Sequence, residues 1–194
     1  PAANPVIPLD AEEALPDPVM PEVIMTETHA ATCLVKVGDE MPDFSLEDLE
    51  GNKLTLGDVA GENLTVIFFW NAKHIITRNA LEDLQYDVWD VRQGQGVNVV
   101  GIDVRDTPDE VREMLEAAEV QFTTLLDPGG EYFAQVATGL LPRVYLLGPG
   151  RKVRWFDLEY SHSTRRQLLE AIRFLLETPS DAASSAATEG DTNP

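Results

Sequence analysis

Cysteine is nearly absent from this sequence, since its 194 residues contain only Cys33. A single cysteine excludes an intrachain disulfide and any metal site built from several thiolates. Long apolar runs are also missing, because no stretch approaches the roughly 20 residues that a membrane-spanning helix needs. We therefore expect a protein without a transmembrane segment of its own.

Basic residues are scarce as well. The chain has 14 Lys and Arg residues against 34 Asp and Glu residues, which gives a formal net charge of -20. Such a charge repels the phosphates of nucleic acids and of anionic lipids. The charge therefore argues against a nucleic-acid partner, although 43% hydrophobic residues suit a folded domain.

Composition divides the chain into three segments. Residues 1–35 are rich in proline and acidic side chains and contain no Lys or Arg, which predicts an extended arm. Residues 36–177 carry the periodic apolar patterns of one folded domain, and residues 178–194 form a tail rich in Ser, Ala and Thr. The arm has enough apolar residues to lie against a surface, either of its own domain or of a partner.

The centre of the domain is a buried strand that leads into a helix. Residues 64–70 form an almost unbroken apolar run, typical of a strand that is covered on both faces. Residues 71–74 form a turn, and a helical pattern begins at Ile75. Its apolar face consists of Ile76, Ala80, Leu84 and Val88. Open α/β folds place their chemistry at such a turn.

The remaining patterns predict a mixed sheet with helices on both sides, which is an α/β fold. A capping box of Thr107 and Glu110, with Pro108 at the first helical position, predicts the start of a helix. We expect Ser163 to cap the last helix. The expected strands are two short ones within 38–56, then 97–104, 120–127, 143–147 and 152–158, and the further helices are 131–138 and 163–177.

The residues around this turn resemble the pattern of a known family. A strand that ends in Phe-Trp and is followed by Cys-x-x-Cys and a basic residue is the thioredoxin pattern, and Phe69, Trp70 and Arg78 match it. His74 and Thr77 stand where the two cysteines would be. The chain resembles the redoxin branch of the thioredoxin-like superfamily over residues 36–177. The resemblance implies a thioredoxin-like mixed sheet with an N-terminal β-hairpin extension.

The resemblance also assigns a role to Pro142. In thioredoxin-like proteins a cis-proline lies beside the redox pair, and Leu141-Pro142 matches that position. With His74 and Thr77 in the cysteine positions, the turn has no thiolate for disulfide exchange or peroxide reduction. We therefore expect no catalytic residues, no cofactor and no enzymatic activity.

What the resemblance implies instead is a structural or accessory subunit. Such domains occur in large membrane-bound electron-transfer assemblies, respiratory or photosynthetic. The expected contacts with protein partners are the arm and a basic, aromatic hairpin. Its residues are Arg151, Lys152, Arg154 and Trp155.

Two alternatives remain open for the site. One is a non-thiol metal site at His74, with His162 as a second weak candidate, although no spacing signature supports a metal. The other is a peptide-binding domain that uses His74 and the Pro142 loop. For the compartment, the resemblance favours an extracytoplasmic, periplasmic protein that associates with the membrane through partners. The first residue, Pro1 rather than Met, favours the cytoplasmic alternative.

Overall fold

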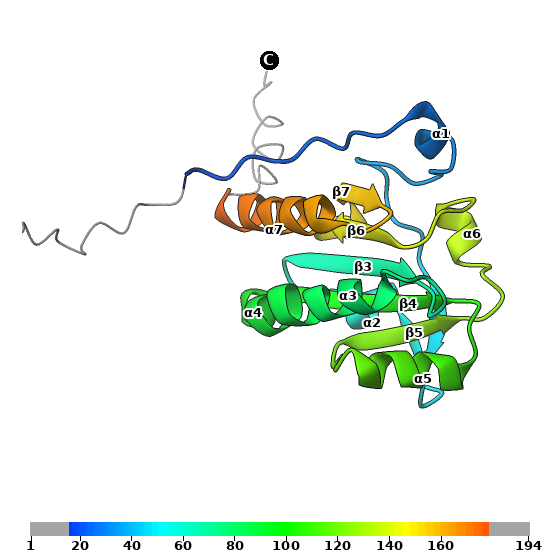
Figure 1. The fold of residues 1–194 in the computed structure, drawn as a ribbon. Helices are drawn as coiled ribbons and strands as arrows, with labels where there is room; N and C mark the ends of the chain where they lie inside the picture. Colours follow the sequence, from blue (N-terminus) through cyan, green and yellow to red (C-terminus); the bar gives the residue numbers. More distant parts are fainter. Residues whose placement is uncertain (1–15, 179–194) are drawn as a thin grey trace, which may run out of the picture.

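The computed structural model of the chain describes residues 16–178 and contains a seven-stranded mixed sheet (Figure 1). The strand order is β2-β1-β5-β4-β3-β6-β7, in which β3, β4 and β5 are parallel and the other neighbours are antiparallel. The strands are β1 Ser45–Asp48, β2 Lys53–Thr55, β3 Leu64–Trp70, β4 Val97–Val104, β5 Thr123–Asp127, β6 Arg143–Leu147 and β7 Val153–Leu158. The predicted α/β fold with a thioredoxin-like mixed sheet and an N-terminal hairpin is confirmed.

Helical segments connect these strands. They are α1 Glu27–Ala30, α2 Leu56–Val59, α3 Thr77–Asp83, the π-helical segment η1 Leu84–Trp89, α4 Asp90–Arg92, η2 Gln93–Gln95, α5 Pro108–Ala117, α6 Phe133–Val136, η3 Pro149–Arg151 and α7 His162–Glu177. The capping box of Thr107 and Glu110 is present at the start of α5. None of the helices in residues 16–178 is both long enough and apolar enough to cross a membrane.

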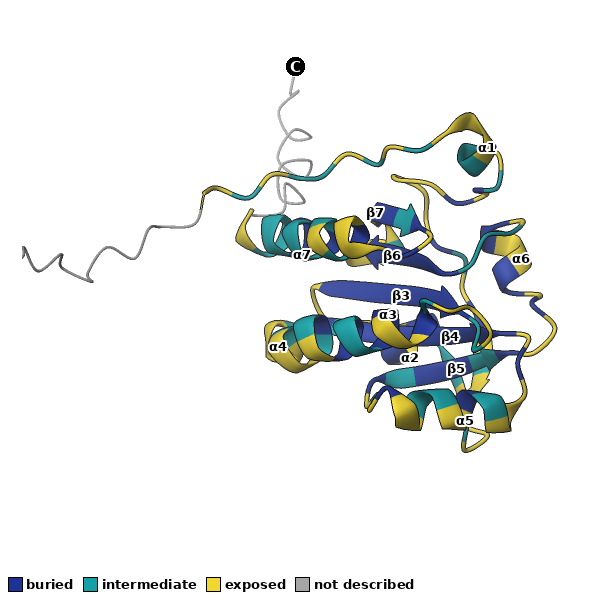
Figure 2. Cartoon of the chain, in the orientation of Figure 1, coloured by how far each residue is buried: buried dark blue, intermediate teal, exposed yellow. Residues whose placement is uncertain are grey.

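The sheet has a hydrophobic core on each face, and its central strands are buried (Figure 2). On one face, α3, α5 and α7 pack on alternate residues of β3 such as Phe68 and Trp70. On the other face, α2, α6 and residues 33–44 pack on the intervening residues, including Ile67 and Phe69. Because both faces are covered, all seven residues of β3 are buried.

The described part of the N-terminal arm, residues 16–35, lies against its own domain. It runs beside α7 towards α1 in Figure 1, and the Arg173 side chain donates a hydrogen bond to the Pro16 carbonyl at 2.7 Å. Val23 and Met25 pack on the core. The rest of the predicted arm and the tail from residue 179 onward lie outside the described residues.

Three helix starts differ from the expected positions, and one of them is α6, which begins at Phe133 rather than at Glu131. The central helix begins at Thr77 rather than at Ile75, because residues 71–76 form a turn held by side-chain hydrogen bonds. The last helix begins at His162, and its cap is Ser161 rather than Ser163. The Ser161 hydroxyl accepts a hydrogen bond from the Thr164 N–H, so it satisfies one of the free amides of the first turn.

Candidate functional site

Three segments meet at one edge of the sheet. The helix-entry turn, residues 71–76, follows β3, and Trp70 at the end of β3 is paired with Asp103 near the end of β4. On the other side of β3, Phe69 is paired with Arg143 at the start of β6. Pro142 therefore lies beside the end of β3, and the helix-entry turn, the end of β4 and the loop before β6 form one site.

Polar side chains hold the helix-entry turn in place. The Asn71 side-chain oxygen accepts a hydrogen bond from the His74 N–H at 3.1 Å. The Thr77 hydroxyl donates to the Asn71 carbonyl at 2.7 Å. These bonds hold residues 71–76 in a turn that competes with helical structure, which accounts for the later start of α3.

The two former cysteine positions differ in exposure. His74 is exposed, whereas Thr77 is 0% exposed. Between them, Ile75 points into solvent and is 96% exposed, more than any other large apolar side chain in residues 16–178. Single exposed apolar side chains are common on protein surfaces, so the exposure of Ile75 shows only that this side chain is accessible to another molecule.

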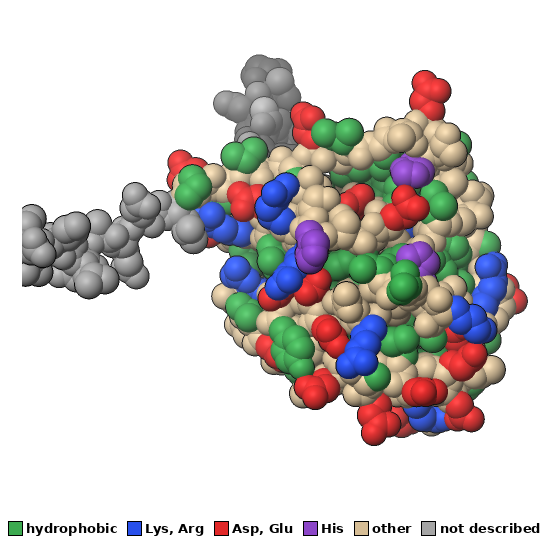
Figure 3. Space-filling view, in the orientation of Figure 1, with side chains coloured by type: hydrophobic (Ala, Val, Ile, Leu, Met, Phe, Trp, Pro, Cys, Tyr) green, Lys and Arg blue, Asp and Glu red, His purple; other side chains and the backbone are tan. Residues whose placement is uncertain are grey.

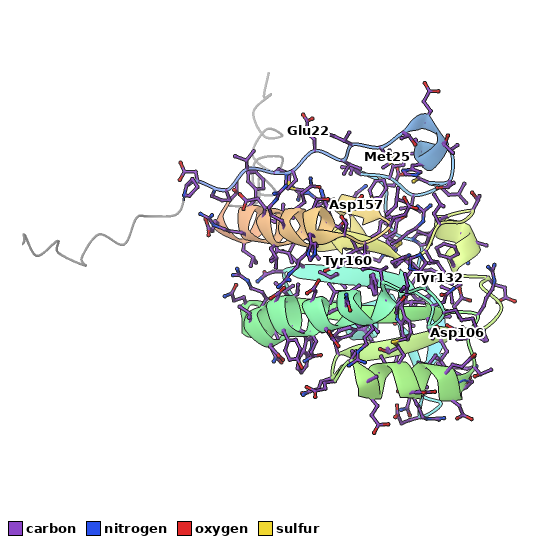
Figure 4. All side chains as sticks on the ribbon, in the orientation of Figure 1. Glu22, Met25, Asp106, Tyr132, Asp157 and Tyr160 are labelled. Atoms are coloured by element: carbon purple, nitrogen blue, oxygen red, sulfur yellow. The ribbon has the colours of Figure 1, made fainter. Side chains whose placement is uncertain are left out.

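An ion cluster lies under the turn, beside Asp106, which is labelled in Figure 4. One carboxylate oxygen of Asp106 accepts the Ala72 N–H, and the other lies 3.4 Å from the Lys73 amino group. Lys73 also lies 3.4 Å from the Glu110 carboxylate. Hydrogen bonds that Lys73 donates to Glu110 and Asp106 raise the pKa of Lys73, and hydrogen bonds that Glu110 accepts from Thr107 lower the pKa of Glu110. The cluster thus joins the turn to the start of α5.

Asp103 is a buried carboxyl group next to this cluster. Its side chain is 0% exposed, and burial, followed by the neighbouring Asp106, raises its pKa to about 8. One oxygen accepts the Asp106 N–H at 3.2 Å, while the other has no hydrogen-bond partner among the described residues. The Trp70 indole N–H and the Thr124 hydroxyl are also unpartnered there, and both approach the space above Gly101. Asp103 can therefore hold or release a proton near neutral pH beneath the turn.

The proline loop, residues 139–142, completes the site. The Leu141–Pro142 peptide bond is cis, the form expected from the sequence. In the described part of the chain, the backbone N–H and C=O of Leu141 have no hydrogen-bond partner, and its side chain is only partly buried. An extended peptide can bond to such free backbone groups as an added strand does.

The metal alternative has no support from a cluster of ligands in residues 16–178. Within residues 16–178, no group of three or more His, Cys, Asp and Glu side chains is placed to hold a metal ion. His74 lies on the turn, and His162 begins α7 in a depression of about 440 Å³ that is lined by residues of α7 and by Arg92 of α4. His74 and His162 therefore lie in different parts of the structure.

The prediction that Trp155 is exposed as part of a basic, aromatic hairpin surface is wrong. This side chain is 0% exposed and belongs to the core, because β7 is covered on both faces. Arg151 forms ion pairs with Glu40 and Asp43, so its charge is already paired. Arg154 is exposed, but without the tryptophan the hairpin is not the basic, aromatic surface that we expected.

Sequence reasoning did not find Lys73, Asp103, Asp106 and Arg143. The aspartate within the otherwise apolar run of residues 97–104 is a signal that could have identified Asp103, because a buried strand seldom carries a carboxylate without a reason. No pattern in the sequence indicates that Arg143 is buried.

Solved structures with this fold include several thiol-disulfide proteins. A thiol:disulfide interchange protein from a Bacteroides species is 16% identical and has a TM-score of 0.62, covering 77% of this chain and 96% of its own. A secreted Mycobacterium tuberculosis disulfide oxidoreductase homologous to Escherichia coli DsbE is 18% identical and has a TM-score of 0.57. That match covers 68% of this chain and 93% of the other. At these identities the likeness establishes the fold alone.

Among curated proteins, the thiol-disulfide oxidoreductase ResA of Bacillus cereus is 24% identical over 121 residues. The match covers 61% of this chain and 68% of ResA. The names of these relatives are those of enzymes, which overturns our expectation that the protein is not an enzyme. The missing cysteines argue against thiol-disulfide exchange at the helix-entry turn, and they do not argue against catalysis in general.

The sequence also matches a family model. The model is that of the AhpC/TSA family, and the match extends over residues 37–156. This range contains the helix-entry turn, Asp103, Asp106 and the proline loop, and it confirms the resemblance to the redoxin branch. The assignment of His74 and Thr77 to the positions of the redox cysteines stays a prediction from the sequence pattern. The chain belongs to the AhpC/TSA family.

Proposed function

We propose that this redoxin-family chain binds an extended segment of a protein partner at the edge formed by the helix-entry turn and the proline loop. In this proposal it is an accessory subunit of a larger, membrane-associated assembly outside the cytoplasm. The turn itself does not exchange disulfides. The observation that carries the proposal is Ile75, which is 96% exposed in a turn that has no sulfur atom.

The geometry beside Ile75 supports a peptide as the ligand. Across from the turn, the N–H and C=O of Leu141 have no partner among residues 16–178, and they form the pair that an added strand requires. Apolar side chains also lie along the line between α7 and α3 in Figure 3, with acidic and basic side chains around them. A partner segment with an apolar residue opposite Ile75 would bury surface that is now in contact with water.

The similar proteins support the proposed location outside the cytoplasm. One solved structure of this fold is that of a secreted disulfide oxidoreductase. The accessory role is supported by the sequence resemblance and by the acidic arm. Metal binding remains an alternative without support from the geometry, because the described residues contain no three-ligand group.

The test compares two exposed apolar positions. The tagged chain is purified in mild detergent from its native membrane, and partners present in equal amount are identified by mass spectrometry. We expect Ile75→Glu to lose the stoichiometric partner, because a charge would be buried at the contact. Val91→Glu is the matched control, since Val91 is 57% exposed on α4 away from the turn.

The outcomes separate the proposal from its rivals. Loss of the partner with Ile75→Glu alone supports binding at the turn. Equal retention by both variants places the contact elsewhere and contradicts the proposal. A chain that purifies alone in every preparation contradicts the accessory role. A bound stoichiometric metal that is lost on His74→Ala would favour the metal alternative instead.

A further inference from the structure

Arg143 is a buried cation, with 1% of its surface exposed. No carboxylate forms an ion pair with it anywhere in residues 16–178. A buried charge without a counter-charge is costly unless hydrogen bonds replace the water that it has lost. The partners of its guanidinium group are therefore essential to the local structure, and they come from two distant segments of the chain.

The first set of partners belongs to the proline loop. The Arg143 Nε donates to the carbonyl oxygens of Gly139 and Leu140, both at 2.9 Å, and Nη2 donates to Gly139 at 2.6 Å. Leu140 has a φ angle of 62°, in the left-handed region that residues with a side chain rarely adopt. Such a conformation persists only where the surroundings hold it. Arg143 supplies part of that support.

The second set of partners belongs to the arm. Nη2 of Arg143 also donates to the Thr32 hydroxyl, and Nη1 donates to the Cys33 sulfur at 3.3 Å. The Thr32 carbonyl accepts the Thr138 N–H at 3.0 Å, which ties the arm directly to the chain just before the loop. Met25 of the arm, labelled in Figure 4, packs on the same core and contacts the Cys33 sulfur.

We propose that Arg143 is a positioning residue that couples the docking of the arm (residues 16–35) to the shape of the proline loop. Removal of the arm would leave part of the guanidinium without partners, so this group would be held less firmly against the Gly139 and Leu140 carbonyls. Partner binding at the loop then depends on the docked arm. This last step rests on the proposed function, whereas the coupling concerns the free protein.

Cys33 makes the coupling measurable, because it is the only cysteine and is 5% exposed. Thr32→Val keeps the size of the side chain and removes the hydroxyl, which accepts a hydrogen bond from Arg143 and donates one to the His29 carbonyl within the arm. We expect a maleimide to label Cys33 at least about tenfold faster in this variant, the factor for a lost hydrogen bond to a charged group. Thr138→Val is the matched control, since this exposed threonine makes no side-chain bond to Arg143.

The loop is measured in the same samples by ¹⁵N relaxation of Gly139, Leu140 and Leu141. We expect the order parameters of these amides to fall from about 0.85 to below about 0.6 in Thr32→Val and to stay unchanged in Thr138→Val. Faster labelling of Cys33 without any change in the loop would overturn the coupling. Unchanged labelling would overturn it as well.

Partner binding separates the two proposals. If Thr32→Val changes both the labelling and the loop and also weakens capture of the partner, the arm controls the binding site. By linkage, bound partner must then favour the docked arm and slow the labelling of Cys33. If labelling and loop change but capture does not, the coupling stands, the control of binding is overturned, and the partner site proposed at the proline loop is wrong.

Discussion

Asp103 should make this protein less stable as the pH rises, which is the opposite of the usual effect of a carboxylate. Its pKa is about 8 in the folded protein, against an ordinary value of 3.8. Between these values the folded state holds a proton that the unfolded state has released. The free energy of unfolding must therefore fall as the pH rises from about 4 to about 8, and it must become independent of this group above that.

The magnitude follows from the linkage. One proton of difference changes the free energy of unfolding by at most about 1.4 kcal/mol per pH unit, which sets a ceiling of about 4 kcal/mol between pH 5 and pH 8. Solvent near the turn and the shared titration with Asp106 weaken the effect, so we expect about 2 kcal/mol. The carboxyl groups with lowered pKa values, Asp48, Asp58 and Glu110, titrate below this window.

The assay is urea unfolding followed by tryptophan fluorescence at pH 5, 6, 7, 8 and 9. Asp103→Asn keeps the shape of the side chain and the oxygen that accepts the Asp106 N–H, but it cannot ionise. We expect the stability of this variant relative to the wild type to increase by about 2 kcal/mol between pH 5 and pH 8, because only the wild type loses stability as the unfolded state releases its proton. Asp109→Asn, at a carboxylate with 96% side-chain exposure, is the control. If Asp103→Asn keeps the pH slope of the wild type, the reasoning is refuted.

Two more predictions concern the same edge of the sheet. Replacing His74 and Thr77 together by cysteine should create a pair that forms a disulfide and reduces insulin disulfides faster than the wild type, because the helix-entry geometry is kept. Mass spectrometry detects the loss of two hydrogens on oxidation, and turbidity follows the reduction of insulin. A pair that stays reduced under oxidising conditions would count against this prediction. Gly101→Ala should destabilise the fold by about 1 to 3 kcal/mol in thermal unfolding, since the new carbon would lie 3.1 Å from the Thr124 hydroxyl and 3.2 Å from the Trp70 indole nitrogen. Unchanged stability would mean that this space is larger than the structure shows.

The strands were predictable where apolar runs are long. The predicted ranges 64–70, 97–104 and 143–147 coincide with β3, β4 and β6, because strands buried on both faces carry continuous apolar side chains. Trp155 shows the limit of this approach. Alternation along an edge strand suggests one exposed face, and nothing local indicates that residues packed on both faces would cover it.

The site was predictable only in outline. The cis bond before Pro142 was predicted correctly because this proline occupies a fixed place in a family pattern, and the same pattern predicts His74 and Thr77 at the cysteine positions. Arg143 was missed because its partners Thr32 and Cys33 lie more than a hundred residues earlier in the chain. The late start of α3 was missed for a related reason, since the side-chain bonds of Asn71 compete with the helix in a way that apolar periodicity does not report.

Photo-crosslinking from position 75 tests the central claim most directly. A benzophenone side chain replaces Ile75 in the full chain within its native membrane, and a second preparation carries it at Val91 on α4. The account predicts that position 75 crosslinks to one partner protein through a single extended segment, and that position 91 does not reach that segment. Absence of a crosslink from position 75, with or without one from position 91, would contradict a partner bound at the helix-entry turn.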